Sequence, residues 1–105
     1  AYVEVKNVHL RRRPGLAEFP DCVTSRGAKH LLELADMVRA GHRAVMLYLV
    51  QRDDCDQFRI AADLDPAYAD GLVRAVAAGV EACCFVCKVS PDGIVVDREI
   101  PVLLS

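Results

Sequence analysis

The sequence predicts an α/β domain with a mixed central sheet and flanking helices. Three observations lead to this fold class. A valine-rich run opens the chain at residues 2–10, and strands favour β-branched residues. Apolar residues at positions 31, 34, 35 and 38 have the spacing of a buried helix face. The apolar run within residues 43–51 does not alternate with polar residues, which fits a central strand covered on both faces.

The first half of the chain gives a strand, a loop, a helix and a strand. Residues 11–24 contain Arg-Arg-Arg-Pro-Gly and Phe-Pro-Asp, which predict a loop. A helix begins near Thr24 or Ser25, since either side chain can cap it. It ends before Gly41, a good helix stop.

The second half adds a helix and two strands. Residues 52–64 predict a loop. Asp65-Pro66 predicts a helix cap followed by proline at the first helical position, and this helix runs to about Ala78 with Gly79 as its stop. Leu72, Val73 and Val76 are expected to point inward. Residues 80–89 and 94–98 predict strands, joined by the turn signal Ser-Pro-Asp-Gly at 90–93.

Length and composition fit one folded domain. The chain has 105 residues, of which 53% are hydrophobic and 27% charged, so we expect a single domain over residues 1–105. The longest apolar run, residues 44–50, is much shorter than the roughly 20 residues of a membrane span, so no membrane is expected as a partner. The sequence lacks a visible signal peptide and an initial Met and opens directly into a strand, so we expect it to be part of a longer polypeptide.

The cysteines indicate a reducing cytoplasm. There are five, an odd number, and Cys83, Cys84 and Cys87 lie close together, which is not typical of a disulfide framework. On a strand Cys83 and Cys87 would face one way and Cys84 the other. We therefore favour buried small hydrophobic residues over a zinc site.

Positive charge gathers near the start of the chain. Between residues 6 and 30 six basic residues face two acidic ones, a net charge of +4, whereas the whole chain carries −2. This asymmetry favours an anionic partner, although three consecutive arginines in a loop could also simply be solvated. The six are Lys6, Arg11, Arg12, Arg13, Arg26 and Lys29.

Glu4 and Lys6 are candidates for phosphodiester chemistry. Residues two apart on a strand share a face, so these two side chains project together, beside Tyr2 and Val8. A carboxylate can hold a divalent cation, and a lysine can bind a phosphate and help to position or activate a water. The alternative is a solvated face, because the pattern Glu-x-Lys is common.

Arg26, Lys29 and His30 share one face at the start of the first predicted helix. The helix dipole would prefer acidic residues there, so a bound phosphate would explain three basic ones. The alternative is that His30 packs at the border of the helix while Arg26 and Lys29 are solvated. Asp21, a few residues earlier, could be a metal carboxylate, but a role in a turn or cap is preferred.

Several motifs resemble those of the sugar fermentation stimulation protein family (SfsA) of bacteria and archaea. The most specific is the block Phe-Pro-Asp-Cys-Val-Thr-Ser-Arg-Gly-Ala-Lys-His-Leu at 19–31. It follows Val-Glu-Val-Lys-Asn-Val at 3–8 and precedes Ala-Val-Met-Leu-Tyr-Leu-Val-Gln-Arg at 44–52. Asp-Pro-Ala-Tyr at 65–68 and Val-Ser-Pro-Asp-Gly-Ile at 89–94 agree, so the resemblance covers nearly the whole chain.

This resemblance implies a fold and a site. Members are usually more than twice this length and carry an OB-like β domain before the part present here. The C-terminal part is similar to the PD-(D/E)XK restriction-endonuclease core. Glu4 would then be a metal ligand, assisted by the backbone carbonyl of Val5, and Lys6 the catalytic-type lysine. The preceding acidic strand of that core is absent, so the site would be half-built and the chain inactive on its own.

The resemblance also implies a function. Family members are described as DNA-binding and linked to the expression of sugar-utilisation genes, so DNA binding in the cytoplasm is the first hypothesis, with Arg11–Arg13, Arg26, Lys29 and His30 contacting phosphates. The second is a Mg²⁺-dependent nuclease acting through Glu4 and Lys6. The third is a catalytically silent scaffold that binds a protein partner. The exposed edge where strands are missing can promote homodimer formation or strand exchange.

Overall fold

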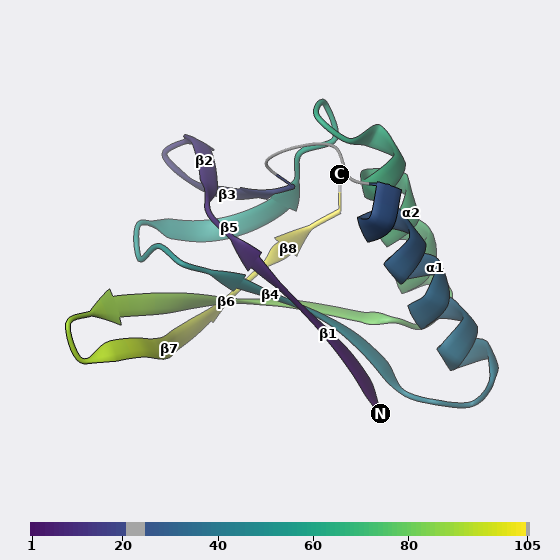
Figure 1. Cartoon of the computed structure of the whole chain (residues 1–105). Helices are drawn as coiled ribbons and strands as arrows, with labels where there is room; N and C mark the ends of the chain where they lie inside the picture. Colours follow the sequence, from purple (N-terminus) through teal and green to yellow (C-terminus); the bar gives the residue numbers. More distant parts are fainter. Residues whose placement is uncertain (21–24, 105) are drawn as a thin grey trace.

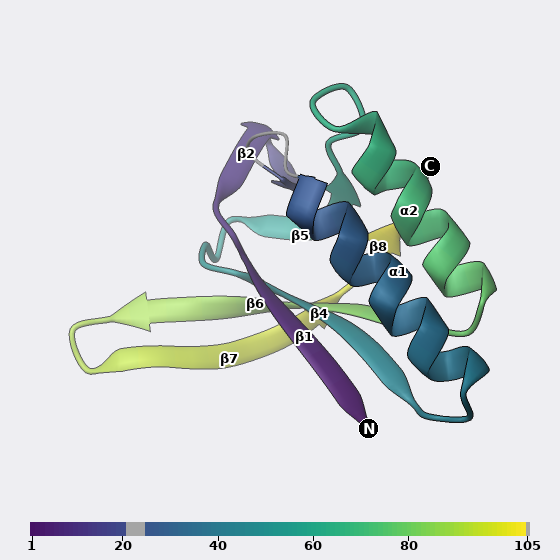
Figure 2. The same cartoon turned by 45° about the vertical axis from the view of Figure 1, so that its right-hand side comes forward.

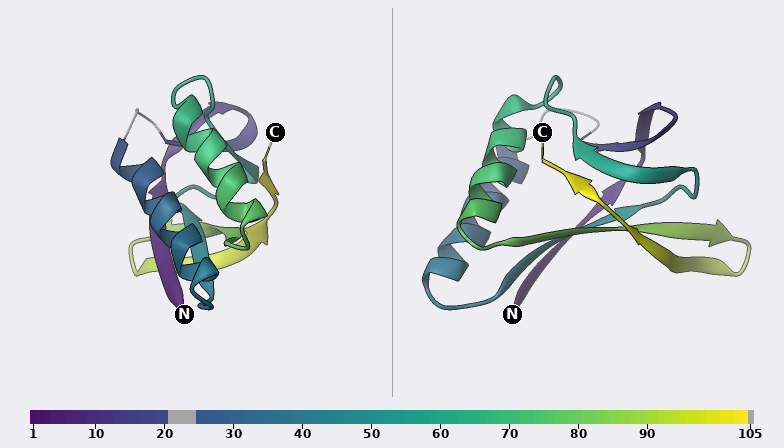
Figure 3. Two further views of the ribbon diagram at one scale, coloured as in Figure 1. Left: turned by 90° about the vertical axis from the view of Figure 1, so that its right-hand side faces the viewer. Right: turned by 180° about the vertical axis from the view of Figure 1, so that it is seen from behind.

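The computed structural model describes residues 1–20 and 25–104, and it confirms the α/β class. Two helices, α1 (Ser25–Arg39) and α2 (Pro66–Ala77), lie side by side and cover one side of the strands (Figures 1 and 3). The strands form two four-stranded sheets. Buried residues of both sheets and both helices form one hydrophobic cluster.

The first sheet carries the candidate pair of charges. Its order is β1-β4-β6-β7; the first three strands are parallel, and the last is antiparallel to β6. Parallel neighbours need a crossover, which α1 supplies between β1 and β4 and α2 supplies between β4 and β6. Residues of β4 alternate between fully and half buried, which confirms a central strand. The bounds are β1 (Tyr2–Val8), β4 (Ala44–Val50), β6 (Glu81–Ser90) and β7 (Gly93–Ile100).

The second sheet occupies segments where the sequence predicts loops. Its order is β2-β3-β5-β8, so the loop predictions for residues 11–19 and 55–60 are wrong. These strands are short and interrupted by polar residues, so they lack a periodic pattern. Between β2 and β3, Gly15 adopts a φ of 77°, a conformation that favours glycine. The bounds are β2 (Leu10–Arg13), β3 (Gly15–Phe19), β5 (Cys55–Ile60) and β8 (Val102–Leu103).

A double ion pair fixes the β2–β3 hairpin. Arg12 on β2 donates from Nε and Nη2 to the carboxylate of Glu18 on β3, at 2.9 and 2.8 Å. The same guanidinium donates from Nη2 to Asp63 at 2.7 Å. Glu18 is only 4% exposed, and a buried carboxylate needs such a partner. Arg12 is therefore held by the fold itself.

The helix ends agree with the sequence. Asp65 caps α2 by accepting a hydrogen bond from the backbone N–H of Tyr68, and Pro66 is the first helical residue. Beyond α1, Gly41 has a φ of 94°. Val73, expected to point inward, is 43% exposed, so that prediction is wrong. The alternative cap Thr24 and the candidate Asp21 lie outside the described residues.

Two of the three clustered cysteines, Cys84 and Cys87, are core residues as predicted, whereas Cys83 is only partly buried; Cys55 is also a core residue. Cys55, Cys84 and Cys87 are at most 1% exposed, and burial raises the pKa of Cys84 to about 12. The predicted alternation along β6 fails at a register shift between Val86 and Cys87, where two neighbouring residues are both buried. Separately, neither described helix is long and apolar enough to cross a membrane.

A buried pair of tyrosines joins the first sheet to α2. The hydroxyl groups of Tyr48 on β4 and Tyr68 on α2 lie 2.6 Å apart, and both side chains are fully buried. Phe19 and Phe58 pack against Tyr48, with ring centroids at 5.6 and 4.5 Å. Since burial raises the pKa of both hydroxyls, they stay protonated and bond to each other.

Tyr68→Phe should lower the free energy of unfolding by about 1–3 kcal/mol, because it leaves the buried Tyr48 hydroxyl without its partner. Removing both hydroxyls in Tyr48→Phe/Tyr68→Phe should cost less than the sum of the two single changes. Urea unfolding of the four proteins measures this coupling. Additive losses would show that the two hydroxyls stabilise the fold independently.

Asp63→Asn should lower the stability of the fold at neutral pH, and this difference from the wild type should disappear in acid. Hydrogen bonds from Arg12 hold the pKa of Asp63 at about 2, below its ordinary value. The ionised carboxylate therefore stabilises the fold above about pH 4, and this contribution is lost as the pH falls towards 2. Urea midpoints between these pH values measure it, with the exposed Asp53→Asn as control. A constant difference across the range would contradict the pairing.

Candidate functional site

Glu4 and Lys6 lie on the face of β1 that turns towards the interior. In the register with β4, Glu4 is paired with Met46 and Lys6 with Tyr48, both fully buried. The side chains of Glu4 and Lys6 are 38% and 21% exposed. The opposite face carries Val3 and Val5, which are 56% and 48% exposed. The charged residues thus occupy the more buried face of the strand, and the solvated-face alternative does not describe them.

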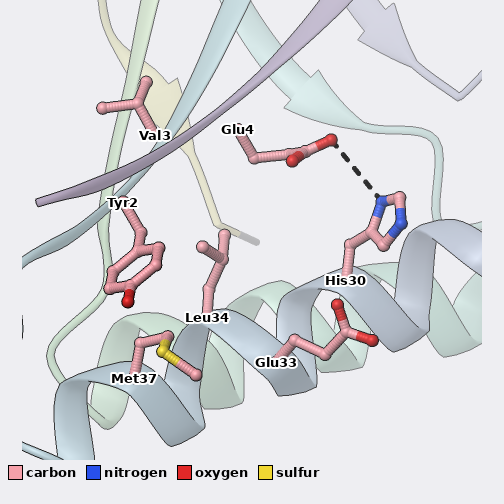
Figure 4. A pocket seen from close by; sticks show the side chains of 7 residues that line it. All are labelled: Tyr2, Val3, Glu4, His30, Glu33, Leu34 and Met37. Carbon is pink, nitrogen blue, oxygen red and sulfur yellow. Dashed lines mark ion pairs between the residues drawn. The ribbon is translucent and has the colours of Figure 1, made fainter.

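Helix α1 brings His30 against this pair. His30 Nδ1 lies 3.3 Å from Lys6 Nζ and 3.6 Å from Glu4 Oε1, and Lys6 Nζ lies 3.6 Å from the same oxygen. Figure 4 shows the imidazole rising from α1 towards Glu4 on the strand above. The neighbouring helix residues Leu31 and Leu34 are buried, so the helix that carries His30 is anchored in the core.

A cavity of about 260 Å³ opens beside these residues, between β1 and α1. In Figure 4, Tyr2 and Met37 line one end and Glu4, His30 and Glu33 line the other. The cavity thus combines an apolar end with a polar one that contains two carboxylates. Sequence reasoning missed Glu33, although it lies three residues after His30 and hence on the same side of the helix.

The backbone carbonyl of Val5 points to the free edge of the first sheet. Tyr2 N–H donates to Arg43 O, and Gln51 N–H donates to Val8 O, so the even-numbered residues of β1 bond to β4. In a strand the next residue directs its N–H and C=O the opposite way, and β1 is an edge strand of the described sheet. Val5 therefore offers a carbonyl oxygen next to Glu4.

These oxygens fit a hard divalent cation. Mg²⁺ and Ca²⁺ take oxygen ligands, and Mg²⁺ usually keeps several waters and one or two carboxylates. Within residues 1–20 and 25–104 there is no group of three His, Cys, Asp or Glu side chains that could hold a metal ion. A cation here would therefore rest on the Glu4 carboxylate and the Val5 carbonyl, with water or substrate as its other ligands.

The negative charge of Glu4 also acts on buried Tyr68. Its pKa is raised to about 12, mainly by burial and further by the negative charges of Asp65 and Glu4. The bonded pair formed by Tyr48 and Tyr68 thus links the floor of the site to α2. A change of charge at Glu4 would be felt in this pair.

The structure places the six basic residues between 6 and 30 in three different surroundings. Arg11 pairs with Asp54 at 3.1 Å, and Arg12 is held by Glu18 and Asp63. Arg13, Arg26 and Lys29 are exposed. Figure 2 shows that the end of β1, strand β2 and the first turns of α1 lie at the same end of the molecule. Lys6 is the basic residue that lies with Glu4 and His30.

The comparisons with known proteins agree with one another. Residues 1–93 match the model of the SfsA family, described as "Sugar fermentation stimulation protein RE domain". A sugar fermentation stimulation protein homologue of Rhodospirillum centenum is 73% identical over 95% of this chain, and one of Sinorhizobium medicae is 62% identical over 99%. These matches cover 43% and 46% of the two relatives, so the chain spans less than half their length.

A solved structure has the same fold. The structure of Pyrococcus furiosus SfsA in complex with Ca²⁺ superposes with a TM-score of 0.89 at 31% identity, over 96% of this chain and 44% of that one. Together with the family model and the relatives, it confirms the resemblance drawn from the motifs. This chain belongs to the sugar fermentation stimulation protein family.

Proposed function

We propose that this chain binds DNA through its phosphates, with one phosphodiester placed at the Glu4–Lys6–His30 cluster. The observation that carries the proposal is the convergence of these three side chains from β1 and α1 on a partly buried face. A phosphate there would meet the Lys6 ammonium directly. The carboxylate of Glu4 would repel it unless a divalent cation lay between them.

The first turns of α1 extend this site towards the DNA backbone. Arg26 and Lys29 are exposed, have no ion-pair partner among the described residues, and lie on the helix that presents His30. The first turn of α1 contains no acidic residue. Basic side chains at a helix N-terminus favour an anion, and most protein–DNA hydrogen bonds go to the phosphates and sugars. Arg13 on β2 can add a contact at the same end of the molecule.

A divalent cation is part of this proposal. The related Pyrococcus furiosus SfsA was solved in complex with Ca²⁺, and the Glu4 carboxylate with the Val5 carbonyl offers oxygen ligands of the kind this cation takes. We propose Mg²⁺ as the physiological cation. When bound, such an ion neutralises charge on a phosphate and lowers the pKa of a coordinated water.

Cleavage of the phosphodiester is the second candidate function. The observation that favours it is a lysine within 3.6 Å of the candidate metal ligand, on the same strand face. Lys6 could hold a phosphate oxygen and orient a water for attack. DNA binding ranks first because the proposed cation has only one protein side chain as a ligand, Glu4, beside the Val5 carbonyl, and the described residues contain no group of three metal-ligating side chains. The link to sugar-utilisation genes would then be a consequence of DNA binding.

The salt dependence of DNA binding tests the first proposal. Each phosphate contact should contribute about −0.9 to the slope of log K against log salt on duplex DNA, so Arg26→Ser and Lys29→Ser should each reduce the slope by about that amount. Arg39→Ser is the matched control, since Arg39 lies at the other end of α1 and pairs with Asp36. Binding that does not change with salt would contradict the proposal and favour a protein-binding scaffold.

Cation binding and cleavage together test the role of Glu4. Calorimetric titration with Ca²⁺ and Mg²⁺ should show an affinity at least about tenfold lower in Glu4→Gln, because the charged ligand is lost. Glu33→Gln should bind normally, since the proposal places the cation on the Glu4 carboxylate and the Val5 carbonyl and gives Glu33 no ligand role, although it lines the same cavity. In the complete protein, of which this chain is expected to be a part, cleavage of DNA with Mg²⁺ should fall about 100-fold or more in Glu4→Gln and in Lys6→Met.

Three results would change this assignment. Cleavage that survives both substitutions would place the activity elsewhere. Salt-dependent DNA binding without any cleavage by the complete wild-type protein would leave binding as the function. Equal losses of cation affinity in Glu4→Gln and Glu33→Gln would make Glu33 a second carboxylate ligand of the cation.

A further inference from the structure

We propose that His30 is a positioning residue for Lys6: its Nδ1 atom accepts a hydrogen bond from the Lys6 ammonium and holds it beside Glu4. The basic pattern of the sequence suggests a phosphate contact for His30 instead. This inference rests on the proposed function for its consequence in DNA chemistry, but its geometry can be tested without any activity.

The three polar atoms form a nearly equilateral triangle. The Nζ–Nδ1 distance is 3.3 Å, and the Nζ–Oε1 and Nδ1–Oε1 distances are both 3.6 Å. Among the described residues, Glu4 and His30 are the hydrogen-bond or ion-pair partners of the Lys6 ammonium. An ammonium has three donors and no acceptor, so it can donate one hydrogen to the carboxylate and another to the imidazole. One cation thus joins two acceptors.

This arrangement fixes the form of the imidazole. Because an ammonium can only donate, this hydrogen bond uses the lone pair of Nδ1, and the ring hydrogen is then on Nε2. A charged imidazole would place two cations 3.3 Å apart. Nε2 is then the nitrogen that remains free to donate, and the side chain of His30 is 23% exposed.

Lys6 is flexible and His30 is more rigid, so the contact between them can hold the Lys6 amine in place. Lysine carries its charge on a flexible four-carbon stem, whereas the short side chain of His30 extends from a helix whose next residue, Leu31, is 1% exposed. If Glu4 turns its oxygens to a cation, its pairing with Lys6 weakens. His30 is then the remaining contact that holds the amine at the place where a phosphate would lie.

Nitrogen NMR of the histidine side chains in this chain tests the geometry directly. We expect neutral His30 in the Nε2–H form, with its Nδ1 resonance shifted by the hydrogen bond. Lys6→Met should move that resonance, while exposed His9, which has no partner among the described residues, serves as the unchanged reference. An Nδ1–H form of His30, or a resonance that ignores Lys6→Met, would overturn the inference.

Three substitutions at His30 separate positioning from phosphate binding. In His30→Asn the amide oxygen is attached to Cγ, as Nδ1 is, so an acceptor for Lys6 remains. His30→Gln places the amide further out, where Nε2 lies in histidine, and His30→Ala leaves no side-chain acceptor for Lys6. If the complete protein cleaves DNA, His30→Asn should retain most of the rate, whereas His30→Gln and His30→Ala should lower kcat about 10- to 100-fold with little change in KM.

The outcomes distinguish this inference from the proposed function. If all three variants show the same rise in KM, or the same loss of DNA affinity, His30 contacts a phosphate and the positioning role is wrong. If the complete wild-type protein shows no cleavage, only the nuclease proposal fails, and the NMR experiment still decides whether His30 holds Lys6. Circular dichroism and urea midpoints should match the wild type in all three variants.

Discussion

The parallel pairing of β1 with β4 is the constraint on which the rest of the site depends. It runs in unbroken register from Tyr2–Ala44 to Val8–Val50. A shift by one residue would turn Val3 and Val5 towards α1 and put Glu4 and Lys6 on the outer face. The anchors lie at both ends, where Ala44, Val8 and Val50 are at most 1% exposed. Packing of small and branched apolar residues therefore decides which face receives the charges.

The long-range architecture follows from that pairing. A parallel neighbour for β1 requires the chain to return from the far end of the strand, and α1 makes this return. Leu31 anchors the inner face of α1, and Gly71 of α2 lies opposite it. A Cβ added at Gly71 would lie 3.4 Å from Leu31 Cδ1. The close packing of α1 against α2 fixes the distance between α1 and β1, and with it the position of His30.

The sequence predicts the elements that bury a continuous apolar surface. The helix face at 31–38, the cap at Asp65 and the central run at 44–50 each have a local signal, and each is present. The β2–β3 hairpin has no such signal, because its stability depends on Arg12 meeting Glu18 across the hairpin and Asp63, 51 positions along the chain. The pattern Glu-x-Lys predicts that Glu4 and Lys6 share a face, but not that His30 faces them. That contact depends on the tertiary distance between β1 and α1.

The orientation of the Val5 carbonyl has a consequence for how this sheet can grow. A further strand paired along the outer edge of β1 would bond to the N–H and C=O groups of Val3, Val5 and Asn7. At Val5 such a strand and a cation would use the same oxygen, which has two lone pairs. A strand that extends the first sheet would take one of them and leave the other for a ligand. Growth of the sheet and occupancy of the site are therefore coupled at that one residue.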